Sequence, residues 1–166
     1  MSPVLTGIAS EGQWGIPGGG FDTVLGLGQY VRKTVVFDSG VGTGAVGKVP
    51  LFDVVGAIAY RLIAICEASL ASGAGATISV GVDGGAAAGI IAVTTAVDLD
   101  AGEIWYDATP TTKQDTWANS IIEQIIGDGA DIEADVLVNP ITSGTLTFAV
   151  FWAPITEGAS LVPTPD

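Results

Sequence analysis

Histidine is absent from this chain of 166 residues, and Cys66 is its single cysteine. Without histidine, the chain lacks the usual general base of Ser-His-Asp and Cys-His catalysis and the commonest zinc ligand. A single cysteine forms no internal disulfide, and Cys66 lies in an apolar run, so we interpret it as a buried, inert thiol. These absences exclude His-dependent catalysis and His-rich metal sites.

Basic residues are also scarce. The chain has 5 Lys and Arg against 18 Asp and Glu, which gives a net charge of -13 and a pI near 4.1. A surface this acidic repels phosphate backbones and anionic lipid. We therefore expect neither a nucleic acid nor a membrane surface as a partner.

Long hydrophobic runs are missing, although 48% of the residues are apolar and the mean hydropathy is +0.55. The longest runs, residues 54–66 and 84–97, are shorter than the ~18–20 residues that a membrane-spanning helix needs. We expect no signal peptide. The length predicts one domain with a real core, and we expect part of the apolar surface to be hidden between subunits.

The sequence divides into three parts. Residues 1–28 are dominated by Gly, Ser and Pro, which predicts an extended N-terminal arm. Residues 29–158 predict a β domain, and residues 159–166 a short Pro-rich tail. The arm contains Trp14, Ile16 and Phe21, which are costly to leave in water, so they pack either on their own domain or on a neighbouring subunit.

From residue 29 onward, runs of β-branched and aromatic residues alternate with glycine-rich turns. We expect strands over residues 30–38, 49–55, 57–67, 76–82, 89–96, 103–108, 131–138 and 144–153. Strands at this spacing, with no crossover helix between them, predict an all-β fold: an antiparallel β-sandwich or a jelly-roll-like barrel. In the last run, Leu146, Phe148, Val150 and Trp152 share one face, which predicts a buried stripe.

The segment over residues 119–127 is ambiguous. Trp117, Ile121 and Ile125 recur with helical spacing, and Gly127 has the position of a residue that ends a helix. Against a helix, Asp128-Gly129 is a hairpin-turn signal directly before a clear strand. We favour a hairpin.

The segment Gly42-Thr-Gly-Ala-Val-Gly-Lys48 has the G-x-x-x-x-G-K spacing of a phosphate-binding loop. Such a loop requires a helix directly after it and a Ser or Thr that binds magnesium. Here Val49 occupies the Ser/Thr position, and Pro50 removes an amide donor. We therefore predict a glycine hairpin loop over residues 40–47 and no nucleotide binding.

Two acidic groups, residues 98–107 and 128–135, are the remaining candidates for chemistry. The first has D-x-D spacing but lacks the distant Glu that completes a calcium loop, so we interpret it as a solvated turn. In the second, alternation assigns Asp131, Glu133 and Asp135 to the solvated face of a strand. A glycosidase requires two facing carboxylates in a cleft, which neither group supplies. We predict that the protein is not an enzyme and assign no catalytic, cofactor-binding or metal-binding residue.

Because the chain has so few basic residues, the position of each one indicates where an acidic partner can bind. Arg32-Lys33 lies in the first expected strand and Arg61 in an apolar one, and each can pair with an acid within the chain or across a subunit boundary. The candidate partner contacts are Trp14, Ile16, Phe21, Arg32 and Lys33.

Three segments have a characteristic sequence: GTGAVGKVPLF at 42–52, GEIWYDATP at 102–110 and SGTLTFAVFWAP at 143–154. With the strands around them, from residue 29 to 158, the chain resembles small acidic, Gly-rich all-β virion proteins of tailed bacteriophages, and most of all capsid decoration proteins. The resemblance implies a protein made in the host cytoplasm that binds the major capsid protein on the capsid exterior, often as a homotrimer, and stabilises the shell. The arm at 1–28 is not part of the resemblance.

Two other functions stay open. One is a tail or baseplate component of a virion. The other is a secreted carbohydrate-binding or ligand-binding β-sandwich, which exposed aromatic side chains in tandem on a sheet face would favour, whereas the aromatic residues of this chain are spread along it.

Overall fold

The structure, a computed structural model, describes residues 29–85, 88–107, 110 and 124–165. The arm with Trp14, Ile16 and Phe21 lies outside the described residues, as do residues 119–123 of the ambiguous segment, so the predictions for them stay predictions. The described ranges contain ten strands and one short 3₁₀-helix, η1 (Ala96–Asp98). Within the same ranges, no helix is long and apolar enough to cross a membrane.

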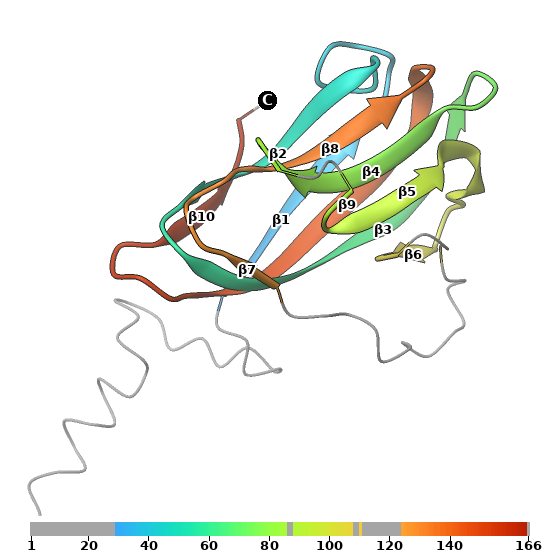
Figure 1. The fold of residues 1–166 in the computed structure, drawn as a ribbon. Coiled ribbons are helices and arrows are strands. Elements are labelled where there is room, and N and C mark those ends of the chain that lie inside the picture. The colour runs from blue at the N-terminus through green and yellow to red at the C-terminus, as the bar shows by residue number, and fades with distance from the viewer. Residues whose placement is uncertain (1–28, 86–87, 108–109, 111–123, 166) are drawn as a thin grey trace, which may run out of the picture.

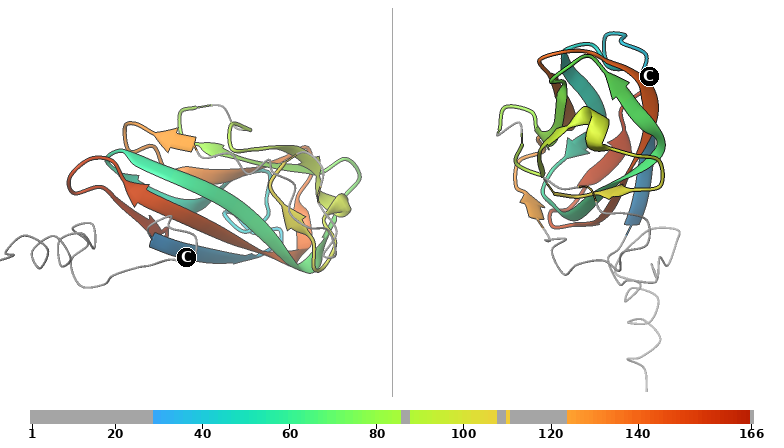
Figure 2. Two further views of the ribbon diagram at one scale, coloured as in Figure 1. Left: turned by 90° about the horizontal axis from the view of Figure 1, so that it is seen from below. Right: turned by 90° about the vertical axis from the view of Figure 1, so that its right-hand side faces the viewer.

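The strands form two antiparallel sheets that pack face to face, which confirms the all-β fold and identifies it as a β-sandwich (Figures 1 and 2). The first sheet has the order β1 (Gln29–Val36), β9 (Ile141–Pro154), β3 (Ile58–Ser72), β6 (Ile104–Trp105), and β7 (Gln124–Ile126) also pairs with β3. The second sheet has the order β10 (Ser160–Pro163), β2 (Gly47–Val55), β8 (Ile132–Leu137), β4 (Thr77–Val82), β5 (Ile91–Thr95).

The core lies between the two sheets and is built from alternate residues of their central strands. The predicted stripe on β9 is confirmed, because Leu146, Phe148 and Val150 are 0% exposed and Trp152 is 4% exposed. Phe148 lies opposite Ala64 of β3 on one side and Lys33 of β1 on the other. The long pairing of β3 with β9 thus forms the first sheet's inner wall.

The inner wall of the second sheet comes from β4 and β8. Ile78 and Val80 of β4 and Ala134 and Val136 of β8 are fully buried, as the alternation of apolar residues in both strands predicts. These residues meet the β9 stripe across the sandwich in one continuous cluster.

Two predicted hairpins are wrong. Residues 37–46 connect β1 in the first sheet with β2 in the second, and residues 127–131 connect β7 in the first sheet with β8 in the second. Residues 124–126 do form a strand, but β7 pairs with β3 instead of β8. Glycine and aspartate set the local reversal of the chain, whereas long-range packing decides which sheet accepts the next strand.

The C-terminal segment also differs from the sequence-based division, because residues 160–163 of the expected tail form strand β10. β10 pairs with Phe52–Val55 of β2, and Pro50 lies beyond this pairing, next to an irregularity in the β2–β8 register. Pro50 itself is paired with Glu133 of β8, and a proline within a strand is tolerated at such an irregularity of the register.

Candidate functional site

The side of the first sheet that faces away from the second carries no carboxylate over residues 30–36 of β1, 145–151 of β9 and 61–65 of β3, and the exposed Glu67 of β3 follows this stretch. Residues of β1, β9 and β3 alternate between the core and this outer side. The outward residues are Tyr30, Arg32, Thr34 and Val36 from β1, Thr145, Thr147, Ala149 and Phe151 from β9, and Arg61, Ile63 and Ile65 from β3. We call this surface the arginine face, because it holds two of the 5 basic residues of a chain with 18 acids.

The outer side of the second sheet has the opposite character. Its central strand β8 places Glu133 and Asp135 on this side, but they are only 9% and 8% exposed, so the prediction that they line a solvated face is wrong. Lys48 of β2 contributes to the burial of Glu133, because its Nζ contacts that carboxylate, and its backbone is paired with Asp135. The same Nζ donates to Asp83 Oδ1 at 2.7 Å, and these hydrogen bonds raise the pKa of Lys48. Lys48 therefore has a structural role on this sheet.

Exposure within the arginine face is greatest along β1. Tyr30 is 50% exposed and Val36 is 61% exposed, and Arg32 and Thr34 between them are also exposed. The Tyr30 ring lies against Phe151 of β9, with 5.1 Å between the ring centroids and an angle of 44° between the planes. This edge of the face thus presents an aromatic pair, an arginine and a valine to solvent.

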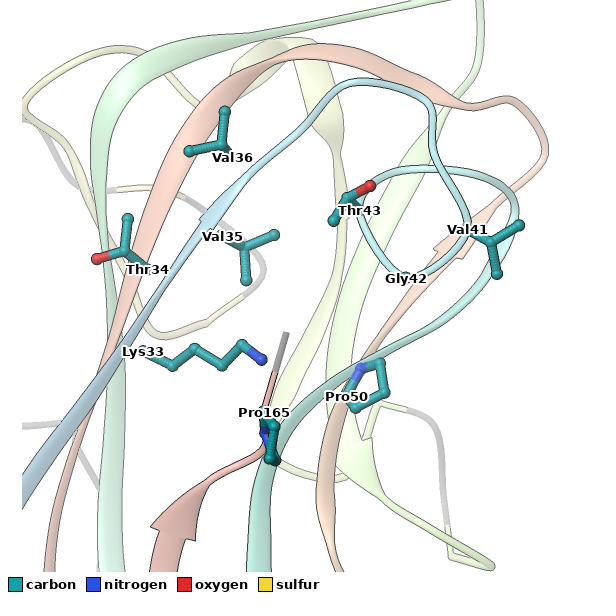
Figure 3. Close-up of a pocket in the computed structure, with 9 residues that line it drawn as sticks. All are labelled: Lys33, Thr34, Val35, Val36, Val41, Gly42, Thr43, Pro50 and Pro165. Carbon is teal, nitrogen blue, oxygen red and sulfur yellow. The ribbon is translucent and has the colours of Figure 1, made fainter.

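A groove of about 400 Å³ runs along the inner side of β1, where the two sheets separate (Figure 3). It is lined by Lys33, Thr34, Val35 and Val36 of β1, Val41, Gly42 and Thr43 of the following loop, Pro50 of β2, and Pro165. Lys33 extends from β1 toward Pro165 in Figure 3. Its Nζ donates to the Thr164 carbonyl at 2.7 Å, which ties β1 to the segment after β10.

The loop that walls this groove is held by one carboxylate. Asp38 accepts hydrogen bonds from the Thr43 hydroxyl at 2.6 Å and the Gly40 amide at 2.8 Å, and these donors lower the pKa of Asp38. The loop includes most of the segment with phosphate-loop spacing, and strand β2 follows it, not a helix. The arrangement lacks the helix N-terminus on which a phosphate loop depends.

In the part of the chain that the structure describes, β1 pairs only with β9, so its other edge is unpaired, although β10 contacts part of β1 without strand pairing. Phe37 donates its amide to the Gly144 carbonyl at 2.9 Å, so the odd-numbered residues direct their backbone groups toward β9. The amides and carbonyls of the even-numbered residues, such as Thr34 and Val36, consequently point away from the sheet. They border the groove of Figure 3.

The structure separates the two described partner-contact candidates. Arg32 lies on the arginine face, whereas Lys33, one residue later, points into the groove. Sequence reasoning missed Tyr30 and Phe151, because they lie far apart in the chain and meet only through the pairing of β1 with β9. Among the described side chains, no group of three Cys, Asp or Glu is placed to hold a metal ion.

Comparisons of the chain with protein-family models, curated proteins and solved structures each found no match.

Proposed function

We propose that this protein is a structural component of a virion that assembles as a homo-oligomer, binds the major capsid protein on the outer capsid surface and stabilises the shell. The arginine face is its contact surface. Support for the viral setting comes from the resemblance of residues 42–52, 102–110 and 143–154 to capsid decoration proteins. These segments form the loop before β2 with β2 itself, the region around β6, and β9.

The observation that carries the proposed contact surface is the uneven distribution of charge. The chain has a net charge of -13, yet no residue of the arginine face is Asp or Glu, and the exposed Glu67 of β3 lies just beyond its end. Tyr30, Phe151 and Val36 give the face apolar area, whereas Ile63, Thr147 and Ala149 at its middle are buried. Interfaces are depleted of acidic residues and enriched in aromatic residues and arginine. Charge elsewhere on the molecule repels other acidic surfaces, so this face is where a partner can approach.

Capsid binding is tested with purified capsids of the protein's own virus, assembled without it, and two variants matched in exposure and charge. Tyr30→Glu places a carboxylate on the arginine face, and Val162→Glu places one on the outer side of β10. Tyr30 and Val162 are both 50% exposed, and both substitutions lower the net charge by one. The wild type and Val162→Glu should sediment with capsids, whereas Tyr30→Glu should bind at least roughly tenfold more weakly, because it replaces an aromatic contact by a carboxylate.

Two results contradict the proposal in different ways. If the wild type does not sediment with the capsids, capsid binding is wrong. If both variants lose binding equally, or neither does, the contact surface lies elsewhere.

A saccharide-binding module is the second candidate function, because Tyr30, which is exposed, and Phe151, which is partly exposed, lie together on the outer side of the first sheet. Aromatic rings stack on sugars most readily when their faces are open. Here the two rings contact each other at 44°, which favours the first proposal. Titration of the protein with oligosaccharides distinguishes the two functions: saturable binding that is lost in Tyr30→Ala, together with no capsid binding, would favour the saccharide module.

A further inference from the structure

We propose that the groove beside β1 receives the N-terminal arm of a second copy of this chain, which adds a strand to the open edge of β1. The inference rests on the homo-oligomer of the proposed function and does not depend on capsid binding. It assigns one contact, between the arm of one copy and β1 of the next.

The length of β1 favours the addition of a strand at its unpaired edge. β1 has 8 residues, whereas the other strands at sheet edges are short: β5 has 5, β6 has 2, β7 has 3 and β10 has 4. Short edge strands discourage pairing with another chain, and a longer one is a template for it. Among the described edge strands, β1 is therefore the longest template; β10 contacts part of it without pairing, and the groove borders its Lys33–Val36 end.

The position of the groove also favours the addition of a strand to β1. It lies next to the outward-directed backbone groups of Thr34 and Val36, and its far side is formed by Val41, Pro50 and Pro165. An added strand hydrogen-bonds to the backbone of its new neighbour, and alternate side chains enter the pockets beside it. The groove thus offers both parts of such a site: backbone donors and acceptors, and a largely apolar space for side chains.

Charge identifies the arm as the better occupant. Residues 1–28 contain Glu11 and Asp22 but no Lys or Arg, whereas β1 contributes Arg32 and Lys33. Pairing of β1 with β1 of a second copy would instead bring like charges together, which destabilises neighbouring strands. A segment that has carboxylates and no Lys or Arg is complementary in charge to this edge.

The sequence of the arm favours a second copy over the chain's own arm. If the chain turned back at Gly26–Gly28 along its own β1, residues 18–20, all glycine, would lie beside Thr34–Val36. Glycine weakens strands and has no side chain to fill a groove. Trp14 and Ile16, two residues apart, share one face of an extended segment. An arm of 28 residues reaches up to ~90 Å, ample for a neighbouring subunit.

Such a contact joins two different surfaces, so each copy both gives an arm and accepts one. Contacts of this kind generate rings when the rotation between copies closes. A trimer, the homo-oligomer that the resemblance implies, is one such ring.

The test uses the full chain and a matched pair of substitutions at Val36. Val36→Pro removes a backbone amide that points to the unpaired edge and makes no hydrogen bond to β9. Val36 is 61% exposed, so the substitution leaves the core unchanged. Val36→Thr keeps the amide and the β-branched shape. Light scattering behind a sizing column, over a range of concentrations, measures the association of each. Trp14→Ala, with Trp14→Phe as its control, changes the arm instead of the edge.

Amide hydrogen exchange locates the contact even if a variant folds poorly. In the wild-type oligomer the Thr34 and Val36 amides should exchange slowly, and dilution to the monomer should make them exchange fast. Mixing isotope-labelled with unlabelled chains and recording intermolecular contacts between Trp14 and β1 shows whether the arm comes from a second copy.

We expect Val36→Pro and Trp14→Ala to dissociate at concentrations at least about tenfold higher than the wild type, and Val36→Thr and Trp14→Phe to resemble it. An oligomer that is unchanged in Val36→Pro, or whose Thr34 amide exchanges fast, overturns this inference and leaves the homo-oligomer standing. A chain that is monomeric at every concentration overturns both. Slow Thr34 exchange in a monomer shows that the arm docks on its own domain, which also overturns the inference. Capsid sedimentation is measured separately and bears only on the proposed function.

Discussion

Truncation of Phe148 to alanine tests the packing of the sandwich most directly. Phe148 lies at the middle of β9, is 0% exposed, and has Ala64 and Lys33 as its strand neighbours. Ala64 is too small to move into the space that the phenyl ring leaves, so a cavity would remain. Removal of a buried phenylalanine costs about 3–5 kcal/mol, and poor collapse places this site in the upper part of that range.

A cost of this size is a large share of the stability of one domain. Each kcal/mol lowers the melting temperature by roughly 2–4 °C in a domain of this size, so Phe148→Ala should melt about 10–15 °C below the wild type. Thermal unfolding followed by circular dichroism measures the difference, and urea unfolding gives the free energy independently.

Phe151→Ala is the matched control, because it removes the same side chain three residues later on the opposite side of β9. Phe151 is only partly buried and packs against Tyr30, a ring contact worth about 0.5–1.5 kcal/mol. It should cost less than about 2 kcal/mol in total. The reasoning is refuted if Phe148→Ala melts like the wild type, or if Phe151→Ala is the more damaging substitution.

Three further predictions concern single residues. Burial raises the pKa of the Cys66 thiol to about 11, so iodoacetamide at pH 8 should modify it, as measured by mass spectrometry, far more slowly in the folded protein than in urea. Gly144→Ala should destabilise by about 1–3 kcal/mol, because Gly144 has φ 117° and a Cβ there would lie 2.7 Å from a β3 carbonyl, whereas Gly127→Ala should melt like the wild type. The hydrogen bond from the Thr43 hydroxyl lowers the pKa of Asp38 in the folded protein below its unfolded value of 3.8. The Asp38 carboxylate therefore stabilises the fold above pH 3.8, and this stabilisation is lost as the pH falls through the folded pKa. The difference in melting temperature between the wild type and Asp38→Asn should shrink from pH 7 to pH 3, and a constant difference would contradict this.

Strands and their inner faces could be predicted from the sequence because alternation is a local signal. The β9 stripe and the apolar residues of β4 and β8 each need only their own residues, and these residues are buried as predicted. The polar alternates Ser79, Glu133 and Asp135 are buried as well, which alternation does not predict. The ends of a strand depend less on the local sequence than its inner face does. β3 continues to Ser72 and β9 begins at Ile141, beyond the predicted runs, because each strand extends the other by pairing.

Which strands are neighbours could not be predicted. Asp83-Gly84-Gly85 joins β4 to β5 as a true hairpin, while Asp128-Gly129 carries the chain from one sheet to the other. Both are good turn sequences, and nothing in them distinguishes the two outcomes. The difference arises from the apolar faces that each strand must cover, a property of the whole sandwich.

The same limit applies to the burial of the acids on β8. Alternation correctly places Glu133 and Asp135 on the side away from the core, but it contains no information about the neighbouring strand. Lys48 arrives there through the β2–β8 pairing and contacts Glu133. A carboxylate on an outer face becomes nearly buried when a long side chain from the next strand lies along it.

At the candidate site, the scarcity of basic residues singles out Arg32 and Lys33 in the sequence, and alternation in β1 explains why they point to opposite sides. The groove and the open edge had no signal in the sequence. Both exist because β1 pairs with β9 on one side, whereas the described strand β10 contacts β1 without pairing with it.

An unpaired edge strand can pair with strands of unrelated proteins, and Lys33 opposes such pairing at β1. A lysine that points inward from an edge strand opposes the addition of arbitrary strands, because its ammonium group must not lose its partners in an apolar space. Here Lys33 donates to the Thr164 carbonyl, so an incoming strand must leave that bond intact or bring a carboxylate of its own. The net charge of -13 adds repulsion between copies everywhere except near such basic positions. The residue that protects the edge therefore also selects its partner, since a strand with acids and no bases is the one that this edge accepts at least cost.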